Sequence, residues 1–263
     1  MTDKPIEKLL SYWRTCPVDH PPYIPSGDRQ SLSSIGQMTY ETFDSYVQSK
    51  SFGAKAETAF HYGLLPIPFV GDLLSAKVFI LLLNPGLSHG DYYAEYQSNK
   101  FREAHIRNLY QDNKKSSYPF HFLDPTFAWH PGFVYWQSKF DDLLQHIASE
   151  KGISYQESLR FLSKRVACLE LYGYHSKTYK GISKRKMLPS TKLMLDYVQQ
   201  DLILRARNGQ ISIIVTRGKS EWGVLSEERQ PNIILYDGTE ARAAYLTKHS
   251  RGRAEIVKRI IKS

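Results

Sequence analysis

The chain has 263 residues, of which 41% are hydrophobic and 23% charged, a balance typical of a globular protein with a sizeable core. Its two cysteines, Cys16 and Cys168, exclude a disulfide framework and a cysteine-rich metal centre. The formal net charge of +9 favours a polyanionic partner, and nucleic acid before a membrane surface.

The first part of the chain leads into one strongly apolar strand. Residues 1–60 are polar and proline-rich, which predicts an N-terminal extension that wraps the core, with a short helix at 39–48. Residues 65–72 are a turn-rich lead. The apolar run 76–83 that follows is typical of a buried parallel strand, and it ends abruptly at Asn84.

The rest of the chain alternates between helices and strands. Residues 87–135 are expected to be mostly loops, some of them aromatic. The elements expected after them are helices at 136–149 and 154–162, a strand at 166–172, a helix at 190–208, strands at 211–216 and 232–236, and a helix at 253–262. This order predicts an α/β fold in one domain, 1–263, with a mostly parallel four-stranded sheet covered by helices.

The loop Asn84-Pro85-Gly86 places a polar amide at the carboxyl end of a buried strand, where open α/β sheets bind their ligands. An asparagine carbonyl accepts a hydrogen bond from water and aims that water at an electrophilic carbon. Because it is a weak base, it suits a substrate that ionises largely by itself, such as a nucleoside whose sugar becomes oxocarbenium-like. Gly86 allows a ligand to approach closely. On the tripeptide alone, a simple turn is the alternative.

Several well-known catalytic motifs are absent from the sequence. It contains no P-loop, no G-x-G-x-x-G after the strand, no G-x-S-x-G elbow and no zinc-deaminase signature. The carboxylate pair Asp141-Asp142 lies in a predicted helix and is interpreted as solvated surface.

The segment Leu65-Pro-Ile-Pro-Phe-Val-Gly-Asp72, then Ala76 and a strand ending in Asn84-Pro-Gly-Leu87, resembles the uracil-DNA glycosylase superfamily. The most similar branch is the mismatch-specific uracil/thymine glycosylases, whose first motif has the form G-x-N-P-G. The resemblance covers roughly residues 60–263 and implies a three-layer α/β/α sandwich. It also implies that Asn84 positions the hydrolytic water below the sugar of a flipped nucleotide, with Pro85 and Gly86 in the base pocket. The family glycine two residues before the asparagine is Leu82 here.

The second motif of the family has no clear copy after the fourth predicted strand. The best-placed segment is Lys248-His-Ser-Arg-Gly-Arg253, which a stretch of about a dozen residues separates from that strand. Under the resemblance, His249 would hydrogen-bond the departing base anion and Ser250 would grip a phosphate. A basic, polar loop in front of a helix is the alternative.

Relatives also stack the flipped base on an aromatic ring and read its edge at the end of the second strand. Tyr118, Phe120 and Phe133 are the stacking candidates because they lie in the loops predicted after the first motif. Tyr174 and His175, with Ser176 beside them, are the candidates for reading the base. Core packing and a plain strand-end turn are the alternatives.

Two basic clusters are interpreted as contacts with DNA phosphates. The first comprises Lys177, Lys180, Lys184, Arg185 and Lys186, and the second comprises Arg242, Lys248, Arg251 and Arg253, with Ser250 beside them. Basic residues next to a helix amino terminus make a good phosphate site, and binding through them should weaken steeply with salt. A solvated charged surface is the alternative.

These features predict a monofunctional DNA glycosylase that leaves an abasic site and needs no metal or other cofactor. DNA is the expected partner. We expect a cytoplasmic location, because the first residues lack a signal-peptide pattern and no apolar run reaches the length of a membrane span. We also expect a monomer. The base stays open between uracil or mismatched thymine, in repair, and a modified cytosine of phage DNA, in antiviral defence. The long aromatic loops would give a bulky base room. A non-catalytic nucleic-acid-binding module and a nucleoside hydrolase are the competing functions.

Overall fold

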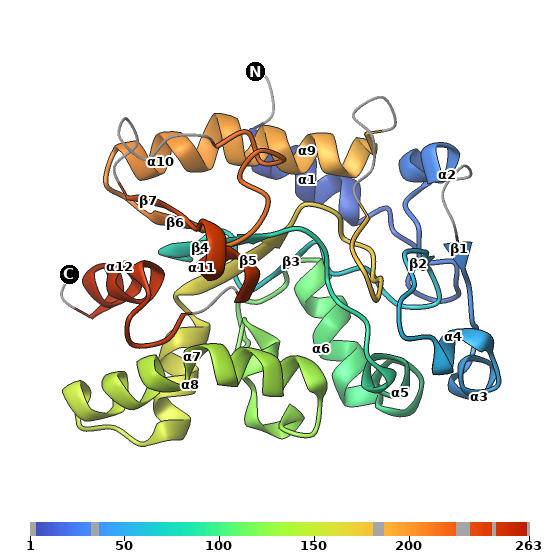
Figure 1. Ribbon diagram of the computed structural model, residues 1–263, viewed down its shortest axis with the longest axis horizontal. Coiled ribbons are helices and arrows are strands. Elements are labelled where there is room, and N and C mark those ends of the chain that lie inside the picture. The colour runs from blue at the N-terminus through green and yellow to red at the C-terminus, as the bar shows by residue number, and fades with distance from the viewer. Residues whose placement is uncertain (1–3, 33–36, 181–186, 225–231, 244–245, 262–263) are drawn as a thin grey trace. The chain divides into compact units, whose positions relative to one another are not determined.

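Apolar strands and amphipathic helices give the chain a mixed α/β fold with a mostly parallel sheet (Figure 1). The computed structural model describes residues 4–32, 37–180, 187–224, 232–243 and 246–261. Contacts divide the chain into two compact units, each built from separate segments. The first unit comprises Met1–Pro68, Leu83–Gln111 and Glu170–Tyr197, and the second comprises Phe69–Leu82, Asp112–Leu169 and Val198–Ser263.

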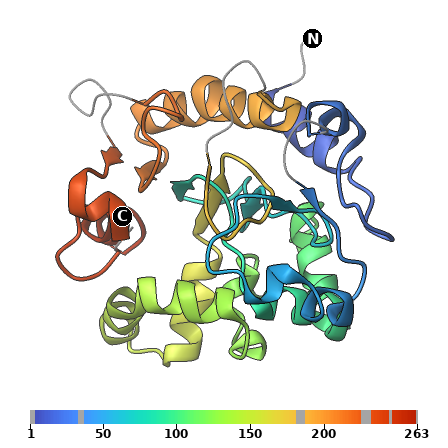
Figure 2. The ribbon, with the colours of Figure 1, turned by 45° about the vertical axis from the view of Figure 1, so that its right-hand side comes forward.

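The first unit is mainly helical. Its helices are α1 (Pro5–Trp13), α2 (Ser26–Leu32), α3 (Phe43–Val47), α4 (Lys50–Gly53), α5 (His89–Gln97), α6 (Asn99–Leu109) and α9 (Pro189–Tyr197). A short parallel pair, β1 (Gln37–Met38) and β2 (Phe60–His61), accompanies them. Helix α1 packs against α9, and α5 against α6, as both ribbon views show (Figures 1 and 2). The predicted extension therefore supplies helices to this unit.

The second unit holds a five-stranded sheet with the order β3-β5-β4-β6-β7. Its strands are β3 (Phe69–Val70), β4 (Val78–Leu82), β5 (Val166–Glu170), β6 (Ser212–Val215) and β7 (Ile233–Leu235). Strand β6 pairs in parallel with both β4 and β7, and every residue of β4 and β5 is buried. The prediction of four strands was wrong, because β3, a two-residue strand beside prolines, adds an antiparallel edge to β5.

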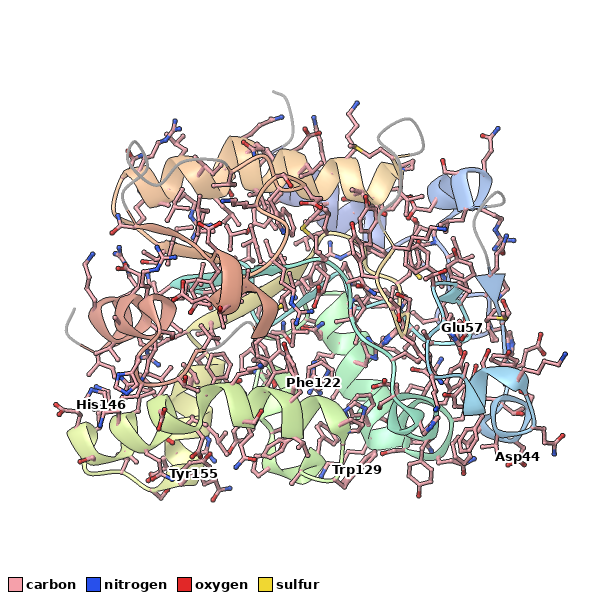
Figure 3. All side chains as sticks on the ribbon, in the orientation of Figure 1. Asp44, Glu57, Phe122, Trp129, His146 and Tyr155 are labelled. Carbon is pink, nitrogen blue, oxygen red and sulfur yellow. The ribbon has the colours of Figure 1, made fainter. Side chains whose placement is uncertain are left out.

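The helices of the second unit are α7 (Pro131–Lys151), α8 (Tyr155–Ser163), α10 (Ile203–Arg207), α11 (Gly238–Ala243) and α12 (Arg251–Ile260). Helix α7 buries Phe140, Leu143 and Leu144 along one face. The Tyr155 hydroxyl, labelled in Figure 3 at the start of α8, donates to Asp141 Oδ1 at 2.9 Å. Asp141 and Asp142 are exposed, as interpreted from the sequence.

The strand predictions at 76–83, 166–172, 211–216 and 232–236 are confirmed within a few residues. The capping box of Ser154 and Glu157 is also confirmed. The helix expected from Ser190 instead begins at Pro189 as α9, continues through a π-helical turn (Val198–Leu202) and ends with α10.

The expectation of loops over 87–135 was wrong. Helices α5 and α6 occupy much of this stretch, and 3₁₀ turns at His121–Leu123 and Pro125–Phe127 order more of it. Helix α5 was missed because its buried residues, Tyr92, Ala94 and Glu95, do not make an apolar stripe. Long loops in this stretch therefore no longer support a base pocket that is large enough for a bulky modified base.

Glu95 gives the stability of the first unit a specific pH dependence. Burial raises its pKa to about 7, against the opposing effect of Arg102, whose Nε lies 2.9 Å from Glu95 Oε1. The folded protein thus holds this proton more tightly than the unfolded chain does. As the pH rises from about 4.5 to 7, the unfolded chain ionises first, and stability falls by on the order of 3 kcal/mol.

Replacing Glu95 with Gln should remove this loss. Urea denaturation at about pH 5 and pH 8 should show that Glu95→Gln is more stable relative to the wild type at the higher pH, with a larger difference in the free energy of unfolding in its favour. An identical difference at the two pH values would contradict the raised pKa.

Candidate functional site

The predicted loop after the first long strand is confirmed. Strand β4 ends at Leu82, and the chain passes through Asn84, Pro85 and Gly86 before α5 begins at His89. Asn84 is half-buried, Pro85 is buried and Gly86 is exposed. The amide is therefore held in a fixed loop and stays partly accessible to solvent.

The Asn84 amide has a defined orientation in the first unit. Its Nδ2 donates to Pro85 O and to Ser176 Oγ, both at 2.9 Å. A carbonyl oxygen only accepts hydrogen bonds, so the Asn84 atom facing Pro85 O must be the nitrogen. Among the described residues no donor hydrogen-bonds Asn84 Oδ1. The loop therefore uses both amide protons and leaves the carbonyl oxygen able to accept a hydrogen bond from water.

His175 and Ser176 also hydrogen-bond to the backbone of this loop. His175 Nδ1 lies 2.7 Å from Gly86 O, so Nδ1 carries the proton and donates it. The backbone N–H of Ser176 donates to Pro85 O at 3.4 Å. His175 is 3% exposed, and its Nε2 has no hydrogen-bond partner in the described part of the chain. In the neutral imidazole this nitrogen is an acceptor, so His175 stays a candidate for reading a base.

The contacts of Tyr174 do not support a role in reading a base. It is 1% exposed, and its hydroxyl donates to Asp28 Oδ2 at 2.7 Å. Burial, and then the Asp28 carboxylate, hold the pKa of Tyr174 well above its usual range, so the hydroxyl stays a donor. Because this side chain is part of a buried hydrogen-bond network, its contacts do not favour the base-reading role predicted for it.

Lys177 is also engaged within the protein. Its Nζ donates to Ser51 O at 2.6 Å and to Ala54 O at 2.9 Å. The ammonium group is thus satisfied by backbone carbonyls, and the phosphate role predicted for it is not the one its contacts favour. Lys180 is exposed. Lys184, Arg185 and Lys186 lie outside the described residues.

The three predicted stacking aromatics are core residues of the second unit. Tyr118, Phe120 and Phe133 are 7%, 0% and 6% exposed. The ring of Phe120 packs edge-on against Trp136, with the centroids 5.1 Å apart. Phe133 is itself part of helix α7. The burial of these three side chains does not favour the base-stacking role predicted for them.

The predicted second motif lies in the second unit, at the start of α12. Ser250 is the N-cap of this helix and accepts a hydrogen bond from Arg253 N. Arg251 is paired with Glu240 at 2.8 Å, and Arg253 Nη2 donates to Asp142 O. Ser250 and the two arginines therefore have structural partners. His249 and Lys248 are exposed, and the side chain of Arg242 lies outside the description.

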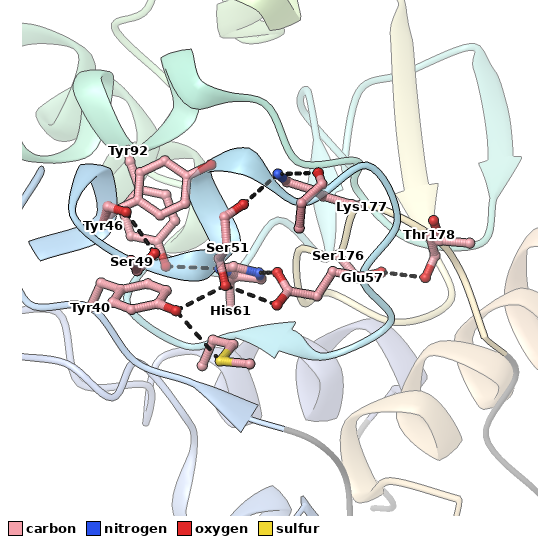
Figure 4. Close-up of polar contacts among 12 residues, drawn as sticks. Tyr40, Tyr46, Ser49, Ser51, Glu57, His61, Tyr92, Ser176, Lys177 and Thr178 are labelled. Atoms are coloured by element: carbon pink, nitrogen blue, oxygen red, sulfur yellow. Dashed lines mark hydrogen bonds and ion pairs between the residues drawn. The ribbon is translucent and has the colours of Figure 1, made fainter.

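Sequence reasoning missed a polar network in the first unit, formed by Ser51, Glu57, His61 and Tyr92. In Figure 4, Glu57 accepts hydrogen bonds from Ser51 Oγ at 2.8 Å and His61 Nε2 at 2.7 Å. His61 Nδ1 in turn lies 3.0 Å from the Tyr92 hydroxyl. Burial lowers the pKa of His61, and the neighbouring Glu57 partly offsets this effect. The only signal in the sequence was the high tyrosine content.

Within the described ranges no helix is long and apolar enough to cross a membrane, and no group of three or more His, Cys, Asp or Glu side chains is arranged to hold a metal ion.

Comparisons with protein-family models, with curated proteins and with solved structures found no match for the chain.

Proposed function

We propose that the protein is a monofunctional DNA glycosylase in which Asn84 positions the hydrolytic water. The observation that carries this proposal is the fixed Asn84 amide, whose two N–H groups are held by Pro85 O and Ser176 Oγ. A three-layer α/β/α sandwich, as in the uracil-DNA glycosylase superfamily, is part of the proposal. Its support is the parallel set β4, β6 and β7, with the Asn84 loop following the first of these strands.

The mechanism starts with extrusion of the target nucleotide, which costs a few kcal/mol of unstacking. The glycosidic bond then stretches, which places positive charge on the sugar and negative charge on the base. Asn84 Oδ1 accepts a hydrogen bond from water and aims the water oxygen at C1′ of the sugar. The water adds to C1′, the base leaves with the bonding electron pair, and the proton released by the water passes to solvent or to the base.

Stabilisation of the departing base needs donors aimed at its developing negative charge. His249 keeps this role as a prediction. His175 is proposed to contact the edge of the base through Nε2, because its other ring nitrogen is already bound to Gly86 O. A neutral Nε2 accepts from the N4 amine of a cytosine or from N3–H of uracil and thymine, so both classes of base remain in the proposal.

An alkali-cleavage assay tests the proposal. Duplex and single-stranded oligonucleotides would carry uracil, mismatched thymine, hydroxymethylcytosine or glucosylated hydroxymethylcytosine. We expect alkali-labile abasic sites with at least one of these bases. DNA binding with no abasic product from any of the substrates would instead favour a non-catalytic module. Release of base from free nucleosides would favour a nucleoside hydrolase.

A further inference from the structure

Residues 175–178 are clamped against residues 51–61 within the first unit. The backbone N–H of His61 donates to His175 O, and that of Thr178 donates to Glu57 O, both at 2.9 Å. The Lys177 ammonium adds the two bonds to Ser51 O and Ala54 O described above, and Figure 4 shows its bond to Ser51. We call residues 175–178 the clamped segment.

Besides the bonds of His175 Nδ1 and Ser176 N to the backbone of the Asn84-Pro85-Gly86 loop, the clamped segment contacts the Asn84 side chain through the hydroxyl of Ser176. Ser176 Oγ accepts from Asn84 Nδ2 at 2.9 Å and donates to Thr178 O at 3.3 Å. The hydroxyl proton is therefore directed away from Asn84, and a lone pair faces the amide. Ser176 is therefore one of the two groups that orient the Asn84 amide, and Pro85 O is the other.

The residues that receive the clamped segment are themselves fixed. Ser51 is 2% exposed, and its hydroxyl lies between the Tyr40 hydroxyl and Glu57 Oε1, at 2.8 Å from each. Glu57 and His61 are bound to each other, and His61 is fully buried. The Ser51 carbonyl that accepts from Lys177 therefore belongs to a residue that is itself held by hydrogen bonds, and we call Ser51, Glu57 and His61 the anchor.

We propose that Lys177 is a positioning residue for Asn84, holding Ser176 in place through its bonds to Ser51 O and Ala54 O, and that it is not a contact for DNA phosphate. This inference rests on the proposed function only where it predicts a change in the rate of base release. The physical link from Lys177 through Ser176 to the Asn84 amide can be measured without any substrate.

The kinetic test replaces Lys177 with Met, which keeps an unbranched side chain one atom shorter and removes the charge and the donors. We expect the single-turnover rate to fall about 10-fold, with little change in the dissociation constant for DNA or in its salt dependence. Lys177→Arg, which retains donors, should recover part of the rate. The matched control is Lys55→Met, an exposed lysine beside the same anchor, which should leave the rate unchanged. A reduced salt slope with weaker DNA binding would instead make Lys177 a phosphate contact and overturn the proposal.

A double-mutant cycle tests whether the effect runs through Ser176. If it does, Lys177→Met should cost little more rate when Ser176 is already Ala. Independent, multiplying losses in the double variant would contradict the inference.

The substrate-free test follows exchange of the two Asn84 Nδ2 protons with water by NMR. We expect faster exchange in Lys177→Met and in Ser176→Ala than in the wild type, with Lys55→Met unchanged. Unaltered exchange in Lys177→Met overturns the positioning role, whatever the enzyme does to DNA. Accelerated exchange in a protein that releases no base would support the positioning role and refute the proposed function.

Discussion

Asn84→Ala is expected to lower the single-turnover rate of base release by at least about 100-fold while leaving DNA affinity within about twofold. The substitution removes the carbonyl oxygen that we propose to orient the water, whereas the backbone of the loop stays hydrogen-bonded to the clamped segment through Ser176 N and His175 Nδ1. The loss should therefore appear in the chemical step and not in binding. Rapid-quench assays under excess enzyme, with fluorescence anisotropy for DNA binding, measure the two quantities separately.

Asn99→Ala is the matched control for this experiment, because Asn99 is an exposed asparagine in the first turn of α6. It should leave both the rate and the affinity unchanged. An Asn84→Ala protein that releases base at the wild-type rate would show that Asn84 does not hold the reacting water.

Asp28→Ala is expected to destabilise the protein by on the order of 3–5 kcal/mol. Asp28 is fully buried and accepts four hydrogen bonds: from Tyr12 OH at 2.5 Å, Tyr174 OH at 2.7 Å, Ser190 Oγ at 2.5 Å and Ser190 N at 3.0 Å. These donors come from α1, from the segment after β5 and from α9. Without the carboxylate they would be left buried and unsatisfied.

Urea denaturation followed by circular dichroism measures this loss as a lower midpoint. The control is Asp44→Ala, which removes an exposed carboxylate from α3 (Figure 3) and should cost less than about 0.5 kcal/mol. If both variants unfold at the same urea concentration, the Asp28 network does not stabilise the first unit as described.

The strands of the sheet could be predicted because their residues are buried on both faces. Strand β4 is a continuous apolar run, and β5 and β6 are apolar except for Glu170 and Ser212 at one end of each. Such runs identify a strand without knowledge of its neighbours. Strand β3 was missed because its two residues, Phe69 and Val70, become a strand only by pairing with Leu169 and Cys168. Pairing of this kind is a tertiary property that local pattern does not carry.

The position of Asn84 could be predicted, but its partners could not. A polar amide after a buried strand is visible in the sequence, whereas Ser176 lies 92 residues further on. Lys177 was interpreted as a phosphate contact for the same reason. The sequence shows that Lys177 lies in a basic run, but only the structure shows that the carbonyl groups of Ser51 and Ala54 accept hydrogen bonds from it.

The aromatic candidates failed for a different physical reason. Tyr118, Phe120 and Phe133 were chosen because they lie in predicted loops, yet all three are buried. Phe120 packs edge-on against Trp136 of α7, and Phe133 is part of α7 itself. Burial of an aromatic ring is worth more to the fold than an exposed stacking face, and a high aromatic content is therefore a weak guide to a binding site.

Detection of the released base by mass spectrometry tests the role of Asn84 most directly. Wild-type and Asn84→Ala protein would be incubated, under single-turnover conditions, with DNA carrying each of the four candidate bases. We predict that the wild type releases one of these bases intact, leaves an unbroken strand with an abasic site, and loses this activity when Asn84 becomes Ala. Release of the base at equal rates by both proteins, or no free base from any substrate with folded wild-type protein, would contradict the account.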